Sequence, residues 1–303
     1  MSWRAGARLR IPEASGEILA SVGEHRILST AQVRAIHYPE RSPRRTQQAL
    51  AYLERAGYLA HVETRRSPRR VWFLTDAGAE AVILAGEVKE RPKVLTPDQA
   101  AGPLASHTLD VNEVGISFLQ AARERDEEFG PLGWRHEVAH SLNRGRGRAG
   151  RRLIADSVFT YVRHEERDWV VEQRFLEVDR ATLSLERLVA ELARYGQLHR
   201  AKVKGRQEPL WRYSYPVFPP VICALTGAPR ATLARRRTMA LTLLDRHPAV
   251  ADNPNVAIYV CFLDELKDRG PYAPIFRKPE ASNQAVNWIG HSDQLTPSGG
   301  DWA

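Results

Sequence analysis

The chain has no long hydrophobic run and very little cysteine. No stretch of about 18 apolar residues occurs in its 303 residues, so we expect neither a membrane span nor a membrane partner. The amino end lacks the apolar segment of a signal peptide, which favours a cytoplasmic protein. The two cysteines, Cys223 and Cys261, lie in apolar segments, where buried free thiols are expected rather than a disulfide.

Lysine and aspartate are absent from residues 1–73, yet this segment carries most of the positive charge. It contains 13 Arg and 6 Glu, a net charge of +7, whereas the whole chain has a net charge of +8. The rest of the chain is therefore close to neutral. A concentration of positive charge on one module is typical of proteins that bind a polyanion such as DNA.

The pattern of this basic segment predicts a winged helix-turn-helix over residues 1–85. Apolar spacing indicates helices over residues 16–24 and 31–38. Ser42 and Pro43 begin a third helix, which we expect to end at Gly57. Two strand-like stretches follow, over residues 58–64 and 69–74, and Thr75 or Asp76 caps a fourth helix.

Two sets of polar residues in this module are candidates for DNA contact. The third helix carries the set expected to meet base edges in the major groove: Arg44, Arg45, Gln47 and Gln48. The hairpin carries the set expected on phosphates or in the minor groove: Arg65, Arg66, Arg69 and Arg70. The alternative is a solvated charged face on a helical protein-interaction domain.

Residues 86–104 contain three prolines and no periodicity, and they predict a linker. Beyond the linker, over residues 105–280, amphipathic helices and short apolar segments follow in the order α-β-β-β-α-β-α-β. That order predicts a mixed α/β sheet with helices on its faces. Residues 281–303 are polar and rich in Gly and Pro, so we expect a loosely ordered tail.

Two familiar motifs are present but lack the context that their chemistry requires. Residues 145–150 spell G-x-G-x-x-G, but a strand-like run follows where a dinucleotide fold has a helix, so no nucleotide cofactor is expected. His136 and His140 complete H-E-x-x-H, which binds zinc when it lies on a helix. Flanking glycines and Trp134 favour a strand instead, so we expect no zinc.

Three acids lie at the ends of two apolar segments. Asp156 lies in one segment, and Glu177 and Asp179 end the next, so a hairpin would bring them together. Buried carboxylates are costly unless they are paired or bound to a metal, and Mg²⁺ or Mn²⁺ would suit oxygen ligands. The alternative is a solvated strand end.

At this point the chain resembles the replication-relaxation family, whose members come from plasmids and integrative elements of Gram-positive bacteria. The resemblance rests on a winged helix, a W-x-x-E strand at Trp134, an Ala-Asp strand at Asp156 and the segment EVDRAT from Glu177 to Thr182. It implies a second domain of the PD-(D/E)xK restriction-endonuclease type. Asp156 and Glu177 would then be its principal acids and Glu137 an accessory acid.

One position departs from the pattern that the resemblance implies. Asp179 stands where such nucleases carry the lysine that orients or activates water. Arg174, Arg180 or Lys202 could substitute, although the pKa of arginine is too high for a base. The resemblance also places Tyr195 and Gln197 where related nucleases have polar helix residues. Because Asp179 replaces the expected lysine, the sequence leaves open whether this chain is an enzyme.

The sequence therefore predicts a protein of a mobile element that binds double-stranded DNA in replication, relaxation or mobilisation. An active Mg²⁺-dependent endonuclease, with Asp156, Glu177 and Asp179 as ligands, is one alternative. A transcriptional regulator with a sensor or dimerisation domain is another. Replication or transfer proteins are candidate partners, and homodimerisation is left open.

Overall fold

The computed structural model describes residues 3–5, 9–63, 70–86, 91–142, 152–165, 168–202 and 208–290, with the side chains from residue 12 onward. The chain divides into two compact units. Unit 1 comprises residues 1–119 and 130–132, and unit 2 comprises residues 120–129 and 133–303. The long helix α6 (Ala105–Arg125) begins in unit 1 and ends in unit 2.

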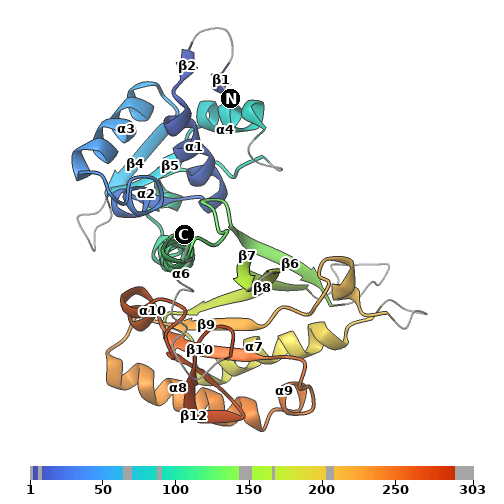
Figure 1. The fold of residues 1–303 in the computed structure, drawn as a ribbon. Coiled ribbons are helices and arrows are strands. Elements are labelled where there is room, and N and C mark those ends of the chain that lie inside the picture. Colours follow the sequence, from blue (N-terminus) through green and yellow to red (C-terminus); the bar gives the residue numbers. More distant parts are fainter. Residues whose placement is uncertain are drawn as a thin grey trace, which may run out of the picture. The chain divides into compact units, whose positions relative to one another are not determined.

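Unit 1 is built from helices and small antiparallel sheets (Figure 1). In addition to the first part of α6, its helices are α1 (Glu13–His25), α2 (Thr30–His37), α3 (Pro43–Arg55), α4 (Asp76–Ala85) and α5 (Pro97–Ala100). Its strands are β1 (Trp3–Ala5), β2 (Leu9–Ile11), β3 (Leu28–Ser29), β4 (Leu59–Glu63) and β5 (Arg70–Leu74). Strands β3, β5 and β4 form a three-stranded sheet in that order, with both pairs antiparallel.

Local sequence signals account for the helix ends in unit 1. Ser29 and Gln32 form a reciprocal capping box at the start of α2. Pro43 occupies the first turn of α3, and Gly57, with a φ of 78°, follows its end. Thr75, rather than Asp76, caps α4 by accepting a hydrogen bond from the Gly78 amide. The helices and the hairpin predicted for this segment are therefore present.

The segment predicted to be a linker contributes to the core of unit 1. Leu95, Ala100 and Ala105 pack with residues of β5 and of the α1–β3 connection. Thr96 and Gln99 form a second capping box that starts the short helix α5. Apolar residues at positions 95, 100 and 105 thus anchor a stretch that has no regular periodicity. The division of the described chain lies inside α6, not in residues 86–104.

Unit 2 is a seven-stranded mixed sheet with helices packed on it (Figure 1). The strands lie in the order β12, β11, β10, β9, β8, β7, β6. Their bounds are β6 (Trp134–Ser141), β7 (Arg152–Glu165), β8 (Asp168–Asp179), β9 (Val221–Leu225), β10 (Ile258–Phe262), β11 (Phe276–Lys278) and β12 (Ala281–Val286). The described helices beyond α6 are α7 (Leu185–Arg200), α8 (Arg230–Asp245), α9 (Pro248–Ala251), α10 (Leu263–Arg269) and the 3₁₀ helix η2 (Leu210–Tyr213).

The centre of this sheet is parallel and its edges are antiparallel. Strands β8, β9 and β10 run parallel, whereas β6, β7 and β8, like β10, β11 and β12, pair antiparallel. All five residues of β9 and of β10 are buried, as expected for central parallel strands. Helices α7 and α8 connect successive parallel strands and share one hydrophobic cluster with them. The mixed α/β fold that we predicted for this region is confirmed.

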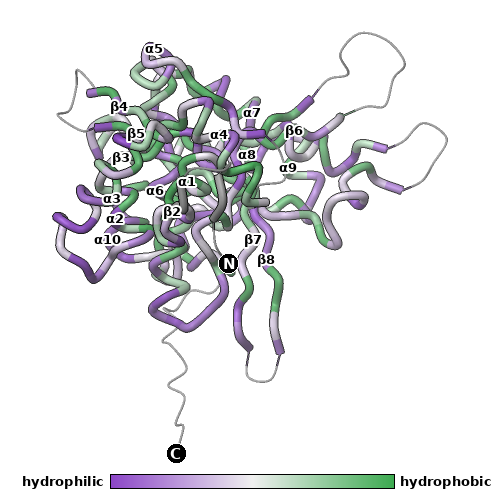
Figure 2. Tube along the Cα trace, turned by 90° about the horizontal axis from the view of Figure 1, so that it is seen from above, coloured by the Kyte–Doolittle hydropathy of each residue, from purple (hydrophilic) through white to green (hydrophobic). Residues whose placement is uncertain are grey.

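Several details of unit 2 bear on the expectations from sequence. The H-E-x-x-H motif lies on β6, so it does not have the helical geometry of a zinc protease. Both cysteines are buried and free. The β7–β8 hairpin extends away from the rest of its unit (Figure 2). No helix in the described ranges is long and apolar enough to cross a membrane.

The polar carboxyl-terminal region begins with a strand instead of a loose tail. β12 pairs antiparallel with β11, and Trp288 is fully buried against Tyr161 and Tyr272. The strand forms because sheet pairing and burial of one aromatic ring offset the polar composition. The rest of the expected tail, residues 291–303, and the glycine motif at 145–150 lie outside the described residues.

Candidate functional site

The β7–β8 hairpin brings two of the predicted acids together. Ser157 pairs with Leu176, so the same register places Asp156 opposite Glu177. The backbone N–H of Val178 donates a 2.8 Å hydrogen bond to Oδ2 of Asp156. A carboxylate that accepts a backbone N–H is held in a defined position. The predicted meeting of these two acids across a hairpin is therefore confirmed by the strand pairing.

Glu177 lies in a half-buried position between a second acid and a tyrosine. The hydroxyl of Tyr195, on α7, donates a 2.5 Å hydrogen bond to Oε1 of Glu177. Burial, followed by the negative charge of Asp156, raises the pKa of Glu177 well above its usual range. A hydrogen bond with Asp156 acts in the same direction, whereas the bond from Tyr195 opposes it. The acid pair therefore favours retaining a proton.

Glu137 lies on β6, the strand that neighbours β7 on the side opposite β8. Its neighbours His136 and Val138 pair with Ser157 and Ala155, so Glu137 lies beside Asp156. Glu137 is exposed and has a left-handed φ of 49°, which is uncommon for a residue with a side chain. Such strain, of about 1 kcal/mol, persists only where surrounding structure imposes it. The predicted accessory acid thus lies at an irregular point of the sheet, next to the acid pair.

Asp179, the third predicted acid, interacts with an arginine that the motif does not contain. Both of its carboxylate oxygens accept hydrogen bonds from Arg236 on α8, one of them at 3.0 Å. Both side chains are largely buried. Oδ1 of Asp179 also accepts from the Ala181 amide at 3.2 Å, and its carbonyl accepts from Thr226. Asp179 therefore anchors the turn after β8 to α8.

These contacts limit how the acids could hold a metal ion. Among the described residues, no group of three or more His, Cys, Asp or Glu side chains is arranged to hold one. Asp156 and Glu177 remain as a pair, and one or two carboxylates can suffice for Mg²⁺ when waters and a substrate phosphate complete the shell. The residues present therefore fit a two-carboxylate Mg²⁺ or Mn²⁺ site better than the predicted three-carboxylate one.

Two charged residues near the acids were not predicted from the sequence. Glu191 lies one helical turn before Tyr195, and partial burial and the charge of Asp156 raise its pKa. Arg236 lies in the run Arg235-Arg236-Arg237, and this run is the sequence feature that could have pointed to Arg236. Neither residue belongs to a motif, because both reach the acids through helix packing.

The residues considered as substitutes for the missing lysine have other positions. Arg174 is buried, donates to Glu172 at 2.8 Å and lies over the ring of Trp288. Lys202 forms an isolated bridge with Pro209 at the end of α7. Arg180 directly follows Asp179, and its carbonyl closely approaches Gly227. Gln197 is exposed on α7. Among the described residues, Arg236 donates hydrogen bonds to Asp179 of the EVDRAT segment.

In unit 1, the predicted DNA-contact residues of α3 share a solvent-facing side. The exposed residues are Arg44, Arg45, Gln47 and Gln48. The opposite side is buried and consists of Thr46, Ala49, Leu50 and Leu53. The first turn of α3 contains no acid. Of the predicted hairpin contacts, Arg70 is exposed and lies 3.8 Å from Glu63, whereas Arg65, Arg66 and Arg69 lie outside the described residues.

The Asp179–Arg236 pair should be strongly coupled. We expect Asp179→Asn to lower the free energy of unfolding by about 3–5 kcal/mol, because it leaves the Arg236 charge buried without its partner. Introducing Arg236→Gln into the Asp179→Asn variant should lower the free energy of unfolding much less than introducing it into the wild type. Urea unfolding of the two single variants and the double variant measures the coupling.

A surface pair offers the matched control. Lys278 and Glu280 lie 3.0 Å apart with Glu280 largely exposed, so Glu280→Gln should cost less than about 1 kcal/mol. Additive effects of Asp179→Asn and Arg236→Gln would contradict the structural role that we assign to the pair.

The raised pKa of Glu177 has a consequence for the pH dependence of stability. A carboxyl with a raised pKa in the folded state stabilises the fold below its usual pKa of 4.5 and loses that contribution as pH rises through the folded-state pKa. Glu177→Gln keeps an acceptor for Tyr195 and removes the charge. The variant should therefore exceed the wild type in free energy of unfolding above neutral pH and lose that advantage in acid.

Urea unfolding as a function of pH measures this difference, and Glu208→Gln, at an exposed position, is the control. A Glu177→Gln variant that tracks the wild type at every pH would contradict the assigned burial and repulsion.

Similarity to known proteins identifies the family of this chain. No curated protein matches the chain. One solved structure, of a mutant of Lactococcus lactis ZitR, is 16% identical, covers 40% of this chain and 79% of that chain, and has a TM-score of 0.24. That score is too low to support an argument. A model of the replication-relaxation family matches residues 19–210, which include α3, the acid pair and the EVDRAT segment. The chain therefore belongs to the replication-relaxation family.

Proposed function

We propose that this protein binds double-stranded DNA through unit 1, as a winged helix-turn-helix, and acts in the replication, relaxation or mobilisation of plasmid or other mobile-element DNA. Unit 2 is then a domain of the restriction-endonuclease type that engages the same DNA. Membership of the replication-relaxation family supports a role on replicating DNA. Replication or transfer proteins are its expected partners.

One observation carries the DNA-binding proposal. Helix α3 presents two arginines and two glutamines to solvent from its first two turns, with no acid among them. Arginine can bind guanine through two hydrogen bonds, and glutamine can bind adenine in the same way. A helix rigidly held by its buried side can insert such residues into the major groove.

The surrounding elements support the same interpretation. Helices α1, α2 and α3 precede the antiparallel hairpin β4–β5, which is the order of a winged helix. The charge of residues 1–73 is +7, so this module would be attracted to phosphates at long range. Arg70 is exposed at the start of β5, on the hairpin that would form the wing.

Replacing base-contacting residues should change sequence preference. We expect Arg44→Ala or Gln48→Ala to reduce discrimination between the preferred duplex and others by about 1–3 kcal/mol for each lost bidentate contact. Selection from a random duplex pool, followed by fluorescence anisotropy with the full chain, measures the change. Arg246→Ala, which removes an exposed charge from unit 2, is the control and should preserve the preference. A wild-type chain that binds no duplex would refute the proposal.

A second candidate function is a Mg²⁺- or Mn²⁺-dependent endonuclease. The observation that favours it is the Asp156–Glu177 pair, whose mutual repulsion a divalent cation would relieve. A bound cation would supply an activated water and stabilise charge on a phosphate. The engagement of Asp179 by Arg236 argues against the full three-acid site.

Cation binding and DNA cleavage by such a site can be measured separately. Mg²⁺ or Mn²⁺ should raise the melting temperature of the wild type but not of Asp156→Asn, because a cation that binds only the folded state stabilises it. Nicking of supercoiled plasmid that Asp156→Asn abolishes would establish the nuclease. Asp168→Asn, at the exposed end of the hairpin, is the control. If the cations cause no thermal shift and the plasmid is not nicked, this candidate function is excluded.

A further inference from the structure

A cationic pocket lies between α2 and α3 in unit 1. Its lining residues are Tyr38, Arg41, Ser42 and Arg45, and its volume is about 410 Å³. A tight turn forms one wall, closed by the hydrogen bond from the Arg41 amide to the Tyr38 carbonyl at 3.1 Å. Of these four described lining residues none is acidic. The pocket therefore concentrates positive charge and hydroxyl groups at one place.

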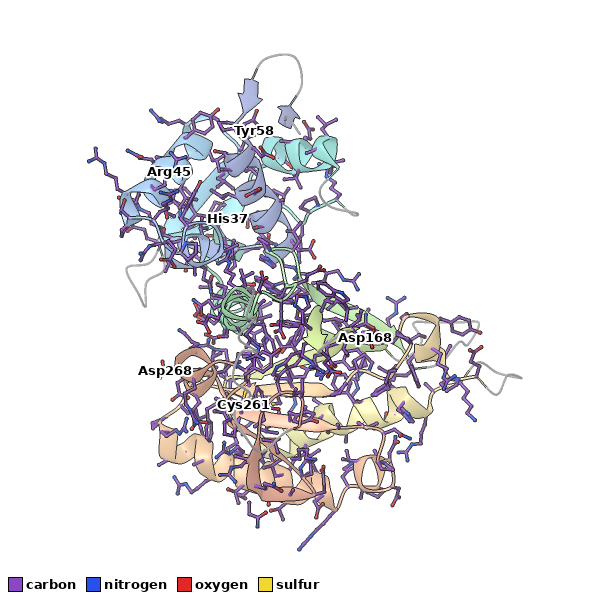
Figure 3. The ribbon with its side chains drawn as sticks, in the orientation of Figure 1. His37, Arg45, Tyr58, Asp168, Cys261 and Asp268 are labelled. Atoms are coloured by element: carbon purple, nitrogen blue, oxygen red, sulfur yellow. The ribbon has the colours of Figure 1, made fainter. Side chains whose placement is uncertain are left out.

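The side chains around this pocket are partly preorganised. Arg45 lies on α3 (Figure 3). The ring of Tyr38 is buried, and the guanidinium of Arg45 lies over it, 5.8 Å from the ring centroid. Arg34 donates a hydrogen bond to the carbonyl of Arg41 at 3.2 Å and so holds the turn in place. A guanidinium supported by an aromatic ring loses less freedom when it binds a ligand.

Contact with the pocket distinguishes Arg45 from the other exposed polar residues in the first two turns of α3. Arg41 precedes Arg45 by four residues and joins it at the pocket. Arg44, Gln47 and Gln48 are not among the residues that line the pocket, although Gln48 lies three residues from Arg45 on the same exposed side of α3. The arginines at positions 44 and 45 thus point to different surroundings.

We propose that this pocket binds a backbone phosphate of the DNA, and that it positions α3 while Arg44, Gln47 and Gln48 read the bases. The inference rests on the proposed DNA binding and assigns Tyr38, Arg41 and Ser42 a role in it. Two guanidinium groups can donate paired hydrogen bonds to phosphate oxygens, and the hydroxyls of Tyr38 and Ser42 add further donors. Phosphate contacts of this kind set register without reading sequence.

The proposal predicts a signature that base contacts would not give. Arg41→Ala and Arg45→Ala should each weaken binding of the full chain to every duplex sequence tested. Removing both guanidinium groups should reduce the slope of log affinity against log salt concentration by about 0.9, the value for one phosphate contact, and each single variant should reduce it by part of that amount. Tyr38→Phe keeps the ring and should weaken binding by about two- to tenfold through loss of one hydrogen bond.

Arg55→Ala is the matched control for these variants. It removes an equal charge from the exposed far end of the same helix and should leave the salt slope unchanged. The measurement is fluorescence anisotropy with short mixed-sequence duplexes over a range of salt concentrations. Circular dichroism of each variant shows whether α3 and its neighbours remain folded.

The outcomes distinguish this inference from the proposed function. If the wild type binds duplexes and Arg41→Ala behaves like Arg55→Ala, the phosphate pocket is wrong and DNA binding stands. If Arg45→Ala changes sequence preference as Arg44→Ala does, Arg45 reads bases and the division of roles is wrong. If the wild type binds no duplex, both proposals fail.

Discussion

The buried ion pair between Asp179 and Arg236 determines the chemistry available in unit 2. A carboxylate that is largely buried must be paired, because desolvation of an isolated charge is costly. Arg236 supplies the partner from α8 and ties the end of β8 to the helix that leads into β10. Asp179 is thereby engaged as an anchor of the fold. The remaining acids, Asp156 and Glu177, form a separate pair whose repulsion is relieved by proton retention or by a cation.

The two units differ in how their charged side chains are placed. Unit 1 presents exposed arginines on one helix, where long-range attraction to phosphates and short-range recognition of bases can act together. Unit 2 has 28 Lys and Arg against 23 Asp and Glu, a net charge of +5, and several of its described charged groups pair with one another within the sheet and helices. Arg163 and Arg174, for example, both pair with Glu172. The charge of α3 is thus exposed, whereas the charge near the acids of unit 2 is largely engaged within the fold.

Much of the fold could be read from local signals. Ser29, Pro43 and Thr75 marked helix starts, because their side chains or rings satisfy or tolerate the free amides of a first turn. Short apolar segments separated by amphipathic helices predicted the mixed sheet. The separation of Asp156 and Glu177 predicted a hairpin contact, which needs only one turn and one register. Glu191 and Arg236 escaped prediction because each reaches the acids across a helix–sheet contact.

The sequence by itself determined where positive charge lies, which face of α3 is apolar, and that two acids meet across a hairpin. These follow from composition and from periodicities of 3.6 and 2 residues. Only the tertiary structure decided that Asp179 faces Arg236, 57 residues away, that Glu137 adopts a left-handed conformation, and that Leu95 and Ala100 belong to a core. Each of these depends on which distant surfaces pack together, and burial then selects partners that local spacing does not encode.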